Sequence, residues 1–413
     1  MPNGVNGNRV LAVGRRTNTA LGRRPLAVSM RTNKAVNENA VRSDANNAFK
    51  EVLKREAASN KPLRFKASKT VAVNDENAEN ATVPAAEKSK IPIGDKKLAL
   101  KKTKPKEEPV VEPIAPQKLG FSSLLLIPHN VENIDSNDGD NVFLTPDYVN
   151  EIYGYLRQLE SEQTIRSNHL SAQKEVTPRM RSILVDWLIH VHHQFRLLPE
   201  TLYLGISIMD RFFQRELISK EKIQLVGVTA FFIASKFEEV YPPDIKDFVM
   251  ICDKLYNKKD VIKMELAILK SLNFELGRPL PLHFLRRFSK AAHADSRIHS
   301  LAKYLMELTL MEYECSHWLP SLSAATSLYV TLKVLTESDD SALKWTPTLE
   351  FYSTYSEAQL MASASAVCKI IIKSDRSKFQ NCRQKYSSSK LMQISQIPQL
   401  KAPIIAEMAA FQC

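Results

Sequence analysis

Residues 181–212 read RSILVDWLIHVHHQFRLLPETLYLGISIMDRF and decide the fold. They form two successive apolar helices, and at 100° per residue the apolar positions of 180–193 cover an arc of roughly 240°. A helix with one buried face requires a much narrower apolar arc. The helix is therefore either surrounded, or it buries one side and offers the other to a partner. Two stripes favour the second arrangement: Met180, Ile183, Leu184 and Trp187 in one, and Val185, Leu188 and Ile189 in the other.

Arg181 lies among these apolar residues. A guanidinium that faces a core must be paired, because an unpaired buried charge costs on the order of 3–5 kcal/mol. Asp210 is the nearest acid that lies at the end of an apolar helix. The spacing therefore predicts an internal ion pair between Arg181 and Asp210.

The net charge of the 413 residues is +12, and it is unevenly distributed. Residues 1–120 hold 24 of the 57 basic residues and 12 of the 45 acidic residues, so they carry the whole excess and the remainder is neutral. A basic isoelectric point would otherwise suggest nucleic-acid binding. Since the folded part is neutral, we expect no direct contact with nucleic acid.

The five cysteines are scattered, without the CxxC or Cys/His spacing of a metal site. We expect buried thiols in a reducing compartment and no metal or other cofactor. No signal peptide and no apolar run of membrane length is visible, so we expect no membrane contact. These features are typical of a soluble protein of the cytosol or nucleus.

Residues 1–120 contain two aromatic residues and no apolar periodicity. Such a segment cannot bury enough surface to offset the entropy lost on ordering, so we expect a disordered regulatory tail. Its basic run at 96–106 is a solvated stretch in one interpretation and a nuclear-import signal in another. A linker is expected at 121–144.

From about residue 145 the pattern is helical and strand signals are weak. Thr145-Pro146 and Thr177-Pro178 each place an N-cap residue before a proline at the first helical position, although proline-directed kinases also modify such pairs. We predict an all-α protein with a first helix at 147–160 and two sets of five helices. The first set is 180–193, 201–214, 221–239, 244–252 and 258–271, and the second is 281–292, 296–315, 320–336, 356–373 and 376–385. The expected domains are 145–277 and 278–390, followed by a C-terminal tail at 391–413.

Enzyme signatures are missing from the sequence, which contains no GxGxxG, P-loop or GxSxG motif. His190, His192 and His193 cluster, but no carboxylate or cysteine lies beside them at ligand spacing. Glu238 and Glu239 are adjacent, so on a helix they diverge and do not form an acid/base pair. We therefore expect neither a metal site nor a catalytic site.

Several motifs along the chain resemble the cyclin box. They are Arg181-x-x-Leu184-x-x-Trp187-Leu188, Leu197, Leu202, Gly205-Ile206, Ile208-Met209-Asp210-Arg211-Phe212, Ala234-Ser235-Lys236-Phe237-Glu238-Glu239 and Lys263-Met264-Glu265. Further motifs resemble mitotic B-type cyclins, namely His317-Trp318-Leu319-Pro320-Ser321, Lys385-Tyr386 and Pro398-Gln399-Leu400. The resemblance covers about 140–410 and implies two tandem five-helix cyclin boxes with a preceding helix.

The resemblance also implies a function, which is to bind and activate a mitotic cyclin-dependent kinase at the G2/M transition, without catalysis by this chain. Such a cyclin shifts the kinase toward its active conformation. Lys236 ends an apolar helix, where the helix dipole favours a cation, and Glu265 interrupts another apolar helix. The kinase contacts implied by the resemblance are Lys236, Glu265, Phe237, Phe274, Tyr148, Ile152 and Tyr155.

By the same resemblance, one apolar stripe forms a groove that docks kinase substrates with Arg-x-Leu motifs. The groove residues are Met180, Ile183, Leu184, Trp187 and, nearby, Gln224. His190 occupies the position at which the family often has an acid to meet the peptide arginine. Packing of the stripe into the core remains the alternative.

B-type cyclins usually carry a destruction box near the N-terminus, and Arg23-x-x-Leu26 is the best match here. A ubiquitin ligase of mitotic exit is therefore an expected partner. The resemblance further implies a protein that moves between cytoplasm and nucleus and is nuclear at mitosis.

Two other classes of function remain open. Tandem cyclin folds also occur in transcription factors that bind nucleic acid, but these usually have a basic core, and often a zinc ribbon. A steep salt dependence of DNA binding by residues 140–413 would favour that class. The other class is an enzyme, which turnover in the absence of a kinase would reveal.

Overall fold

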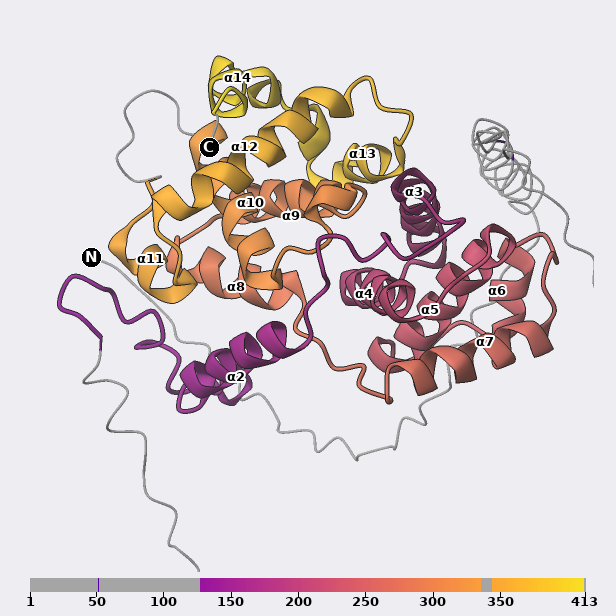
Figure 1. Ribbon diagram of the computed structural model, residues 1–413. Helices are drawn as coiled ribbons and strands as arrows, with labels where there is room; N and C mark the ends of the chain where they lie inside the picture. Colours follow the sequence, from indigo (N-terminus) through magenta and orange to yellow (C-terminus); the bar gives the residue numbers. More distant parts are fainter. Residues whose placement is uncertain (1–50, 52–126, 336–343, 412–413) are drawn as a thin grey trace, which may run out of the picture. The chain divides into compact units, whose positions relative to one another are not determined.

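The computed structural model describes Glu51 and residues 127–335 and 344–411. Within these ranges the secondary structure is helical and contains no β-strand, which confirms the predicted all-α class (Figure 1). Helix α2 (Val149–Glu162) comes first in this part. The first bundle follows, with α3 (Pro178–Phe195), α4 (Pro199–Arg215), α5 (Ile223–Glu238), α6 (Ile245–Ile251) and α7 (Lys258–Ser271).

The second bundle repeats this order of long and short helices. It contains α8 (Pro281–Ala291), α9 (Ser296–Thr309), α10 (Pro320–Leu335), α11 (Pro347–Ser353) and α12 (Glu357–Ser374). Two further helices follow it, α13 (Asn381–Tyr386) and α14 (Pro403–Ala409). The two bundles are joined by the short segment 272–280.

The third helix is the centre of each bundle. α5 packs against α3, α4 and α7, and α10 packs against α8, α9 and α12. All residues of α5 from Ile223 to Ser235 are buried, as is most of α10. A helix that is buried on all sides needs neighbours all round it. The two bundles therefore repeat one arrangement around a central helix.

Two glycines allow the helices of the first bundle to approach closely. A Cβ atom on Gly205 of α4 would lie 2.5 Å from a ring carbon of Phe231 on α5. A Cβ atom on Gly227 of α5 would lie 2.9 Å from a methyl carbon of Leu184 on α3. Only glycine fits where another chain segment comes this close.

The two predicted Thr-Pro caps have different outcomes. Thr177 caps α3, and its Oγ1 accepts a hydrogen bond from Met180 N at 3.3 Å. Thr145 does not cap α2 with its side chain. It ends the 3-10 turn η3 (Val142–Leu144) in the left-handed region, with φ 44°, and its carbonyl accepts a hydrogen bond from Val149 N. The predicted cap at Thr145 is wrong because the preceding residues form a turn of their own.

The prediction for the second bundle is wrong at four helices, one of which is the predicted helix 296–315, since α9 ends at Thr309. It omits α11 and α14, and it takes 376–385 as the fifth helix, where the structure has the shorter α13. α11 and α14 have seven residues each. Seven residues make about two turns and show little apolar periodicity, although α6 has the same length and was predicted.

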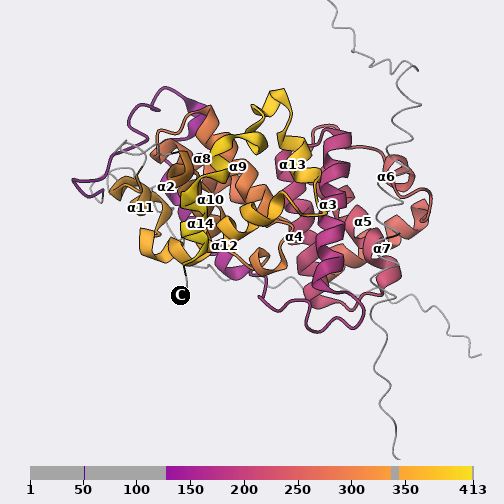
Figure 2. The same cartoon turned by 90° about the horizontal axis from the view of Figure 1, so that it is seen from above.

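Residues 391–411, expected as a C-terminal tail, belong to the second bundle. α14 packs against α12, and Ile405 and Met408 of α14 are buried. α13 lies beside α9 and also beside α3 of the first bundle (Figures 1 and 2). The C-terminal residues are therefore a cover for the second bundle and also contact the first.

Part of the expected linker at 121–144 is also packed. Residues 131–138, which we call the strap, lie against α8 and α11. Ile134 of the strap is 7% exposed. Glu132 N donates a hydrogen bond to Thr348 Oγ1 of α11 at 3.1 Å. The segment before α2 is thus held on the second bundle.

Candidate functional site

Arg181 and Asp210 form a buried ion pair between α3 and α4. Nε of Arg181 donates to Asp210 Oδ1 at 2.7 Å, and Nη2 donates to Oδ2 at 2.6 Å. Nη1 donates to the carbonyl of Leu310, directly after α9, at 2.9 Å. Burial would raise the pKa of Asp210, but the charge and hydrogen bonds of Arg181 outweigh it and lower the pKa to about 2. The pair therefore joins two helices and also the two bundles.

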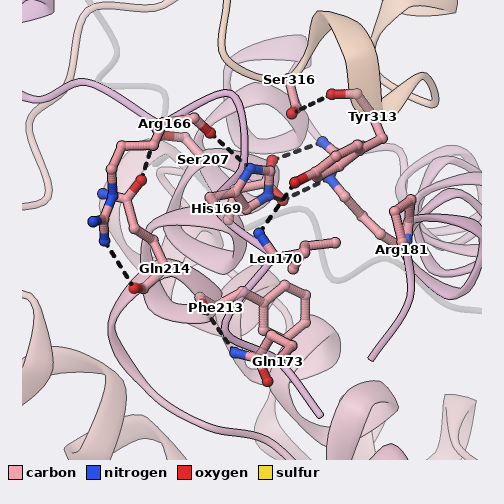
Figure 3. Close-up of polar contacts among 12 residues, drawn as sticks. Arg166, His169, Leu170, Gln173, Arg181, Ser207, Phe213, Gln214, Tyr313 and Ser316 are labelled. Carbon is pink, nitrogen blue, oxygen red and sulfur yellow. Dashed lines mark hydrogen bonds and ion pairs between the residues drawn. The ribbon is translucent and has the colours of Figure 1, made fainter. Parts of the chain in front are cut away.

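The loop between α2 and α3 is held beside this pair (Figure 3). The His169 ring packs against the Tyr313 ring with centroids 5.0 Å apart, and Leu170 N donates to the Tyr313 hydroxyl at 3.2 Å. Gln173 Nε2 donates to the Phe213 carbonyl on α4 at 2.7 Å. Sequence reasoning missed these residues, because a loop has no periodicity that would single them out.

The first bundle exposes a set of large apolar side chains. They lie at the end of α5, on α6 and α7, and in the segments that follow these helices. Exposed apolar groups on neighbouring helices are candidates for an interaction surface. We call this set the open face, and it consists of Phe237, Val240, Tyr241, Met250, Leu255, Ile262, Leu266 and Phe274.

Lys236 and Glu265 form an ion pair that joins α5 to α7 beside the open face. The exposed fractions are 43% for the Lys236 side chain and 15% for that of Glu265. Nζ of Lys236 lies 4.3 Å from the centroid of the Phe232 ring. The structure thus brings the two predicted kinase-contact charges together, with Phe237 adjacent in the chain. It presents both signs of charge next to apolar surface.

Phe274 follows α7 in a turn of two left-handed residues, a form that Asp253 and Lys254 repeat after α6. Asn273 and Phe274 have φ angles of 53° and 61°, and Phe274 N donates to the Leu269 carbonyl at 2.9 Å. Left-handed backbone at a bulky residue costs roughly 1–2 kcal/mol. The hydrogen bond to the Leu269 carbonyl offsets part of this cost at the end of the helix. Phe274 is 64% exposed, so the turn leaves its ring accessible to a partner.

Helix α2 presents a second exposed apolar surface. Its opposite side is fixed to the second bundle, where the Tyr153 hydroxyl donates to the His283 carbonyl at 2.8 Å. The Glu160 carboxylate accepts hydrogen bonds from N and Oγ of Ser321 at 2.9 and 2.6 Å. We call the exposed side the α2 stripe, and it consists of Tyr148, Ile152 and Tyr155.

Two exposed residues just before α2 were not predicted. Val142 and Phe143 of η3 are 84% and 97% exposed. The sequence signal for them was weak, because a three-residue turn shows no periodicity. On α7, Ile262 and Leu266 were also missed. There the signal was present, since the apolar positions of that helix exceed what one buried face requires.

The expected docking groove is buried in this structure. Its members are at most 5% exposed, namely Met180, Ile183, Leu184, Trp187 and Gln224. This low exposure favours the alternative interpretation, in which the stripe packs into the core, and the docking groove stays a prediction. Burial, and then the charge of His193, lower the pKa of His190, so this ring is neutral at pH 7. A neutral ring offers no charge to a peptide arginine.

Within residues 127–335 and 344–411, no three His, Cys, Asp or Glu side chains are placed to share a metal ion. None of the helices in these ranges is long and apolar enough to cross a bilayer. Burial raises the pKa of Cys315 and of Cys368 to about 12. Arg23 and Leu26 of the expected destruction box lie outside the described residues, as does the basic run at 96–106.

Family models match both bundles. Residues 151–277 match the cyclin N-terminal domain, and residues 279–400 match the cyclin C-terminal domain. Together the two matches span more than half of the chain. The second match extends beyond residue 390 and includes part of the segment that was expected as a tail.

Several relatives are named G2/mitotic-specific cyclins. Cyclin-B of Spisula solidissima is 50% identical over 290 residues, which are 70% of this chain and 66% of that one. Cyclin-B2 of Gallus gallus is 49% identical over 292 residues, covering 70% and 71%. Cyclin-B2 of Homo sapiens is 43% identical over 355 residues, covering 86% and 85%. The match spans just under two thirds of the Spisula protein. With two helical bundles that match both cyclin domains, and with this degree of identity, the chain belongs to the cyclin family and, within it, to the G2/mitotic-specific B-type cyclins.

Proposed function

We propose that this B-type cyclin is the regulatory subunit that binds and activates a mitotic cyclin-dependent kinase and so promotes the G2/M transition. The observation that carries the proposal is the open face, where an accessible ion pair lies beside exposed apolar side chains. The relatives are named as mitotic cyclins, which supports the same role.

Lys236 and Glu265 can bond to a partner while they stay paired. A lysine ammonium has three N–H donors, and a carboxylate has about four acceptor sites, so one mutual contact leaves capacity on both. Backbone groups at the end of a partner helix are suitable ligands for such a pair. Burial of the neighbouring Phe237, Ile262 and Leu266 would supply about 25 cal/mol for each Å² of apolar surface removed from water.

Activation follows from selective binding of one kinase conformation. A kinase is active only when its regulatory helix completes the Lys–Glu ion pair at the ATP phosphates. A cyclin that binds this conformation better than the inactive one shifts the population toward it. A shift of the ratio of active to inactive kinase from 1:99 to 99:1 requires about 5.5 kcal/mol of differential affinity. Contacts that the cyclin makes only with the active kinase conformation would supply this difference.

The test is the double variant Lys236→Ala with Glu265→Ala. We expect kinase affinity to fall by about 30- to 3000-fold, because the desolvated charges are lost. Stability should change by less than about 1 kcal/mol, because the pair is accessible to solvent. The matched control is Lys333→Ala with Glu357→Ala, the ion pair between α10 and α12. Equal affinity for wild type and the first variant would reject the interface.

Substrate recruitment, ubiquitin-dependent removal at mitotic exit and passage between cytoplasm and nucleus are further parts of the proposal. Their support is the motif resemblance alone. Since Met180 and Trp187 are buried, a docked Arg-x-Leu peptide has to displace core side chains. Met180→Ala with Trp187→Ala should then lower phosphorylation of Arg-x-Leu substrates more than of short peptides. An equal loss for both substrates would assign the stripe to the core.

A further inference from the structure

Arg287 of α8 connects three segments that are distant in the sequence. Its guanidinium forms an ion pair with Asp135 of the strap, and Nη2 donates to Asp135 Oδ2 at 2.6 Å. The same Nη2 donates to Asn150 Oδ1 at the start of α2 at 3.0 Å. The cation also lies 5.3 Å from the ring centroid of Tyr153 on α2 and 4.8 Å from that of Tyr352 on α11.

The strap has its own contacts beside this cation. Lys290 Nζ donates to Asp135 Oδ1 at 3.1 Å and also pairs with Asp138. The Tyr352 hydroxyl accepts from Ile134 N and donates to the Glu132 carbonyl at 3.2 Å. Acidic side chains and one buried isoleucine are therefore seated on a basic and aromatic surface of the second bundle.

The electrostatics of Asp135 agree with a firm attachment. Its side chain is 10% exposed and that of Arg287 is 5% exposed. Burial alone would raise the pKa of Asp135, but the hydrogen bonds and charges of Arg287 and Lys290 outweigh it, and the pKa is lower than usual. Charge-assisted, bidentate contacts of this kind are roughly twice as strong as neutral hydrogen bonds.

Arg287 is one of several groups that hold α2 on the second bundle. Tyr153 and Asn150 face Arg287, and Arg157 of α2 donates to the carbonyls of Tyr352 and Ser353 at 3.0 and 2.7 Å. The residues of the α2 stripe, in contrast, are 42–63% exposed and point away from these contacts. Their orientation therefore depends on the attachment of the opposite side of the helix.

We propose that Arg287 and the strap residues Ile134, Asp135 and Asp138 form a fastener that fixes α2 on the second bundle and thereby presents the α2 stripe to the kinase in one orientation. Arg287 is then a positioning residue for kinase activation. The role of the α2 stripe in kinase binding rests on the proposed function. The attachment of α2 to the second bundle does not, because it is a property of the chain without a kinase.

Lysine cannot replace Arg287 in this role. A guanidinium has five N–H donors in a rigid fork, so it can bond to a carboxylate and an amide oxygen at once. An ammonium keeps the charge but not this geometry. Arg287→Lys should therefore leave the second bundle folded and loosen both the strap and α2.

The first experiment measures amide hydrogen exchange in the full chain. Asp135→Asn weakens the fastener from the strap side, where a folding defect of the bundle is not expected. We expect exchange of the strap and α2 amides to rise by about tenfold or more, because local opening becomes easier. Asp140→Asn is the matched control, since Asp140 is an exposed acid of the same segment. Unchanged exchange in α2 for both Asp135→Asn and Arg287→Lys would overturn the proposal.

The second experiment measures kinase affinity in two backgrounds. In the chain with an intact stripe, Asp135→Asn should weaken binding by about 5- to 30-fold, since the competent orientation of α2 is populated less. In a chain with Tyr148, Ile152 and Tyr155 changed to Ala, the same substitution should change affinity by less than about twofold, because coupled sites are not additive. Equal weakening in both backgrounds would overturn the positioning role.

The two arms separate this inference from the proposed function. If no kinase binds even the wild-type chain, the proposed function fails, and the exchange experiment still decides whether the fastener holds α2. If the kinase binds and Lys236→Ala with Glu265→Ala abolishes binding, the proposed function stands, whatever the outcome for Asp135.

Discussion

The two bundles carry a lysine at the same place in their central helices, but only one of these lysines lies beside an open apolar surface. Lys236 of α5 lies over the ring of Phe232, four residues earlier, at 4.3 Å. Lys333 of α10 lies over the ring of Tyr329, also four residues earlier, at 5.4 Å. Both lysines are in the last turn of their helix, where the carbonyl ends favour a cation.

The acidic partners of these lysines differ in what else they bind. Glu357 of α12 accepts from Lys333 at 2.8 Å and also from the Tyr329 hydroxyl at 2.8 Å. Glu265 of α7 pairs with Lys236, and the corresponding ring, Phe232, has no hydroxyl to offer. The pair of the second bundle is thus tied into its own chain, and that of the first bundle keeps capacity for a partner.

The fifth helices of the two bundles, α7 and α12, differ in how much of their apolar surface is buried. α7 buries only Val261 and Ile268, and it exposes Ile262 and Leu266. α12 buries residues along most of its length and exposes Ile372, and the cover formed by α14 lies on it. The same architecture can therefore end as a closed unit or as a binding surface. The C-terminal residues of the chain decide which bundle is closed.

The largest expected effect concerns the cover itself. Ile405→Ala on α14 should destabilise the chain by about 2–4 kcal/mol, because a buried side chain is removed from the contact with α12. The matched change on the open face, Ile262→Ala, should alter stability by less than about 0.5 kcal/mol. Denaturant unfolding of both variants gives the comparison. Equal losses of stability would show that α7 is as closed as α12.

Kinase affinity should respond in the opposite order. Ile262→Ala should weaken binding by about 1–2 kcal/mol, since hot-spot contacts in an interface commonly exceed 1 kcal/mol. Ile405→Ala should leave the affinity of the folded fraction unchanged. A reversed order of the two affinities would place the kinase on the second bundle.

A second prediction concerns the link between the cover and the first bundle. Asp186 of α3 accepts hydrogen bonds from N and Nδ2 of Asn381 on α13 at 3.1 and 2.7 Å. Burial raises the pKa of Asp186 to about 6, although these hydrogen bonds lower it in part. The unfolded chain titrates near the ordinary value of 3.8. Between these values the folded chain holds a proton that the unfolded chain has lost, so this group makes stability fall as the pH rises from about 4 to about 6.

Asp186→Asn should remove that slope. Across this pH range, the difference in unfolding free energy between wild type and variant should change by about 1–2 kcal/mol. This magnitude allows for the partial exposure of Asp186. Above the range the difference should stay constant. Urea titrations at several pH values between 4.5 and 7.5 measure the difference. Parallel curves for the two chains would mean that Asp186 is charged in the folded state throughout this range.

The smallest expected effect is at the turn that displays Phe274. Phe274→Gly should change the stability of the free chain by less than about 1 kcal/mol, because relief of the left-handed backbone offsets the greater freedom of the unfolded chain. Kinase affinity should nevertheless fall, since the exposed ring is lost. The measurement is a calorimetric titration of the kinase with both chains. Unchanged affinity would remove Phe274 from the open face.

Much of the first bundle could be predicted from the sequence. The helix ranges follow from long apolar periodicity, and the contact between Arg181 and Asp210 follows from a charge that had to be neutralised. The sequence of the second bundle contains one further signal, which indicates the start of α11. Thr346-Pro347 precedes α11 and repeats the cap of Thr177, with Thr346 Oγ1 accepting from Leu349 N at 3.2 Å.

Other parts of the site depend on contacts that no local pattern contains. Met180 and Trp187 have the spacing of a groove, yet neighbouring helices bury them. Asp135 reads as one acid of a polar linker, and only its partner Arg287, 152 residues away, makes it an anchor. The exposure of a side chain depends on all the elements that pack around it. The periodicity of one helix contains no information about those other elements.

The sequence by itself therefore determined the helical class, the central apolar helices and the internal charge pair, because each depends on spacing within a short stretch or on one unavoidable desolvation cost. Only the tertiary structure decided which bundle is covered, which stripe is buried and where α2 is held. These outcomes depend on short helices and single polar contacts between residues far apart in the chain, and the free energy that selects them exists only after the bundles have formed.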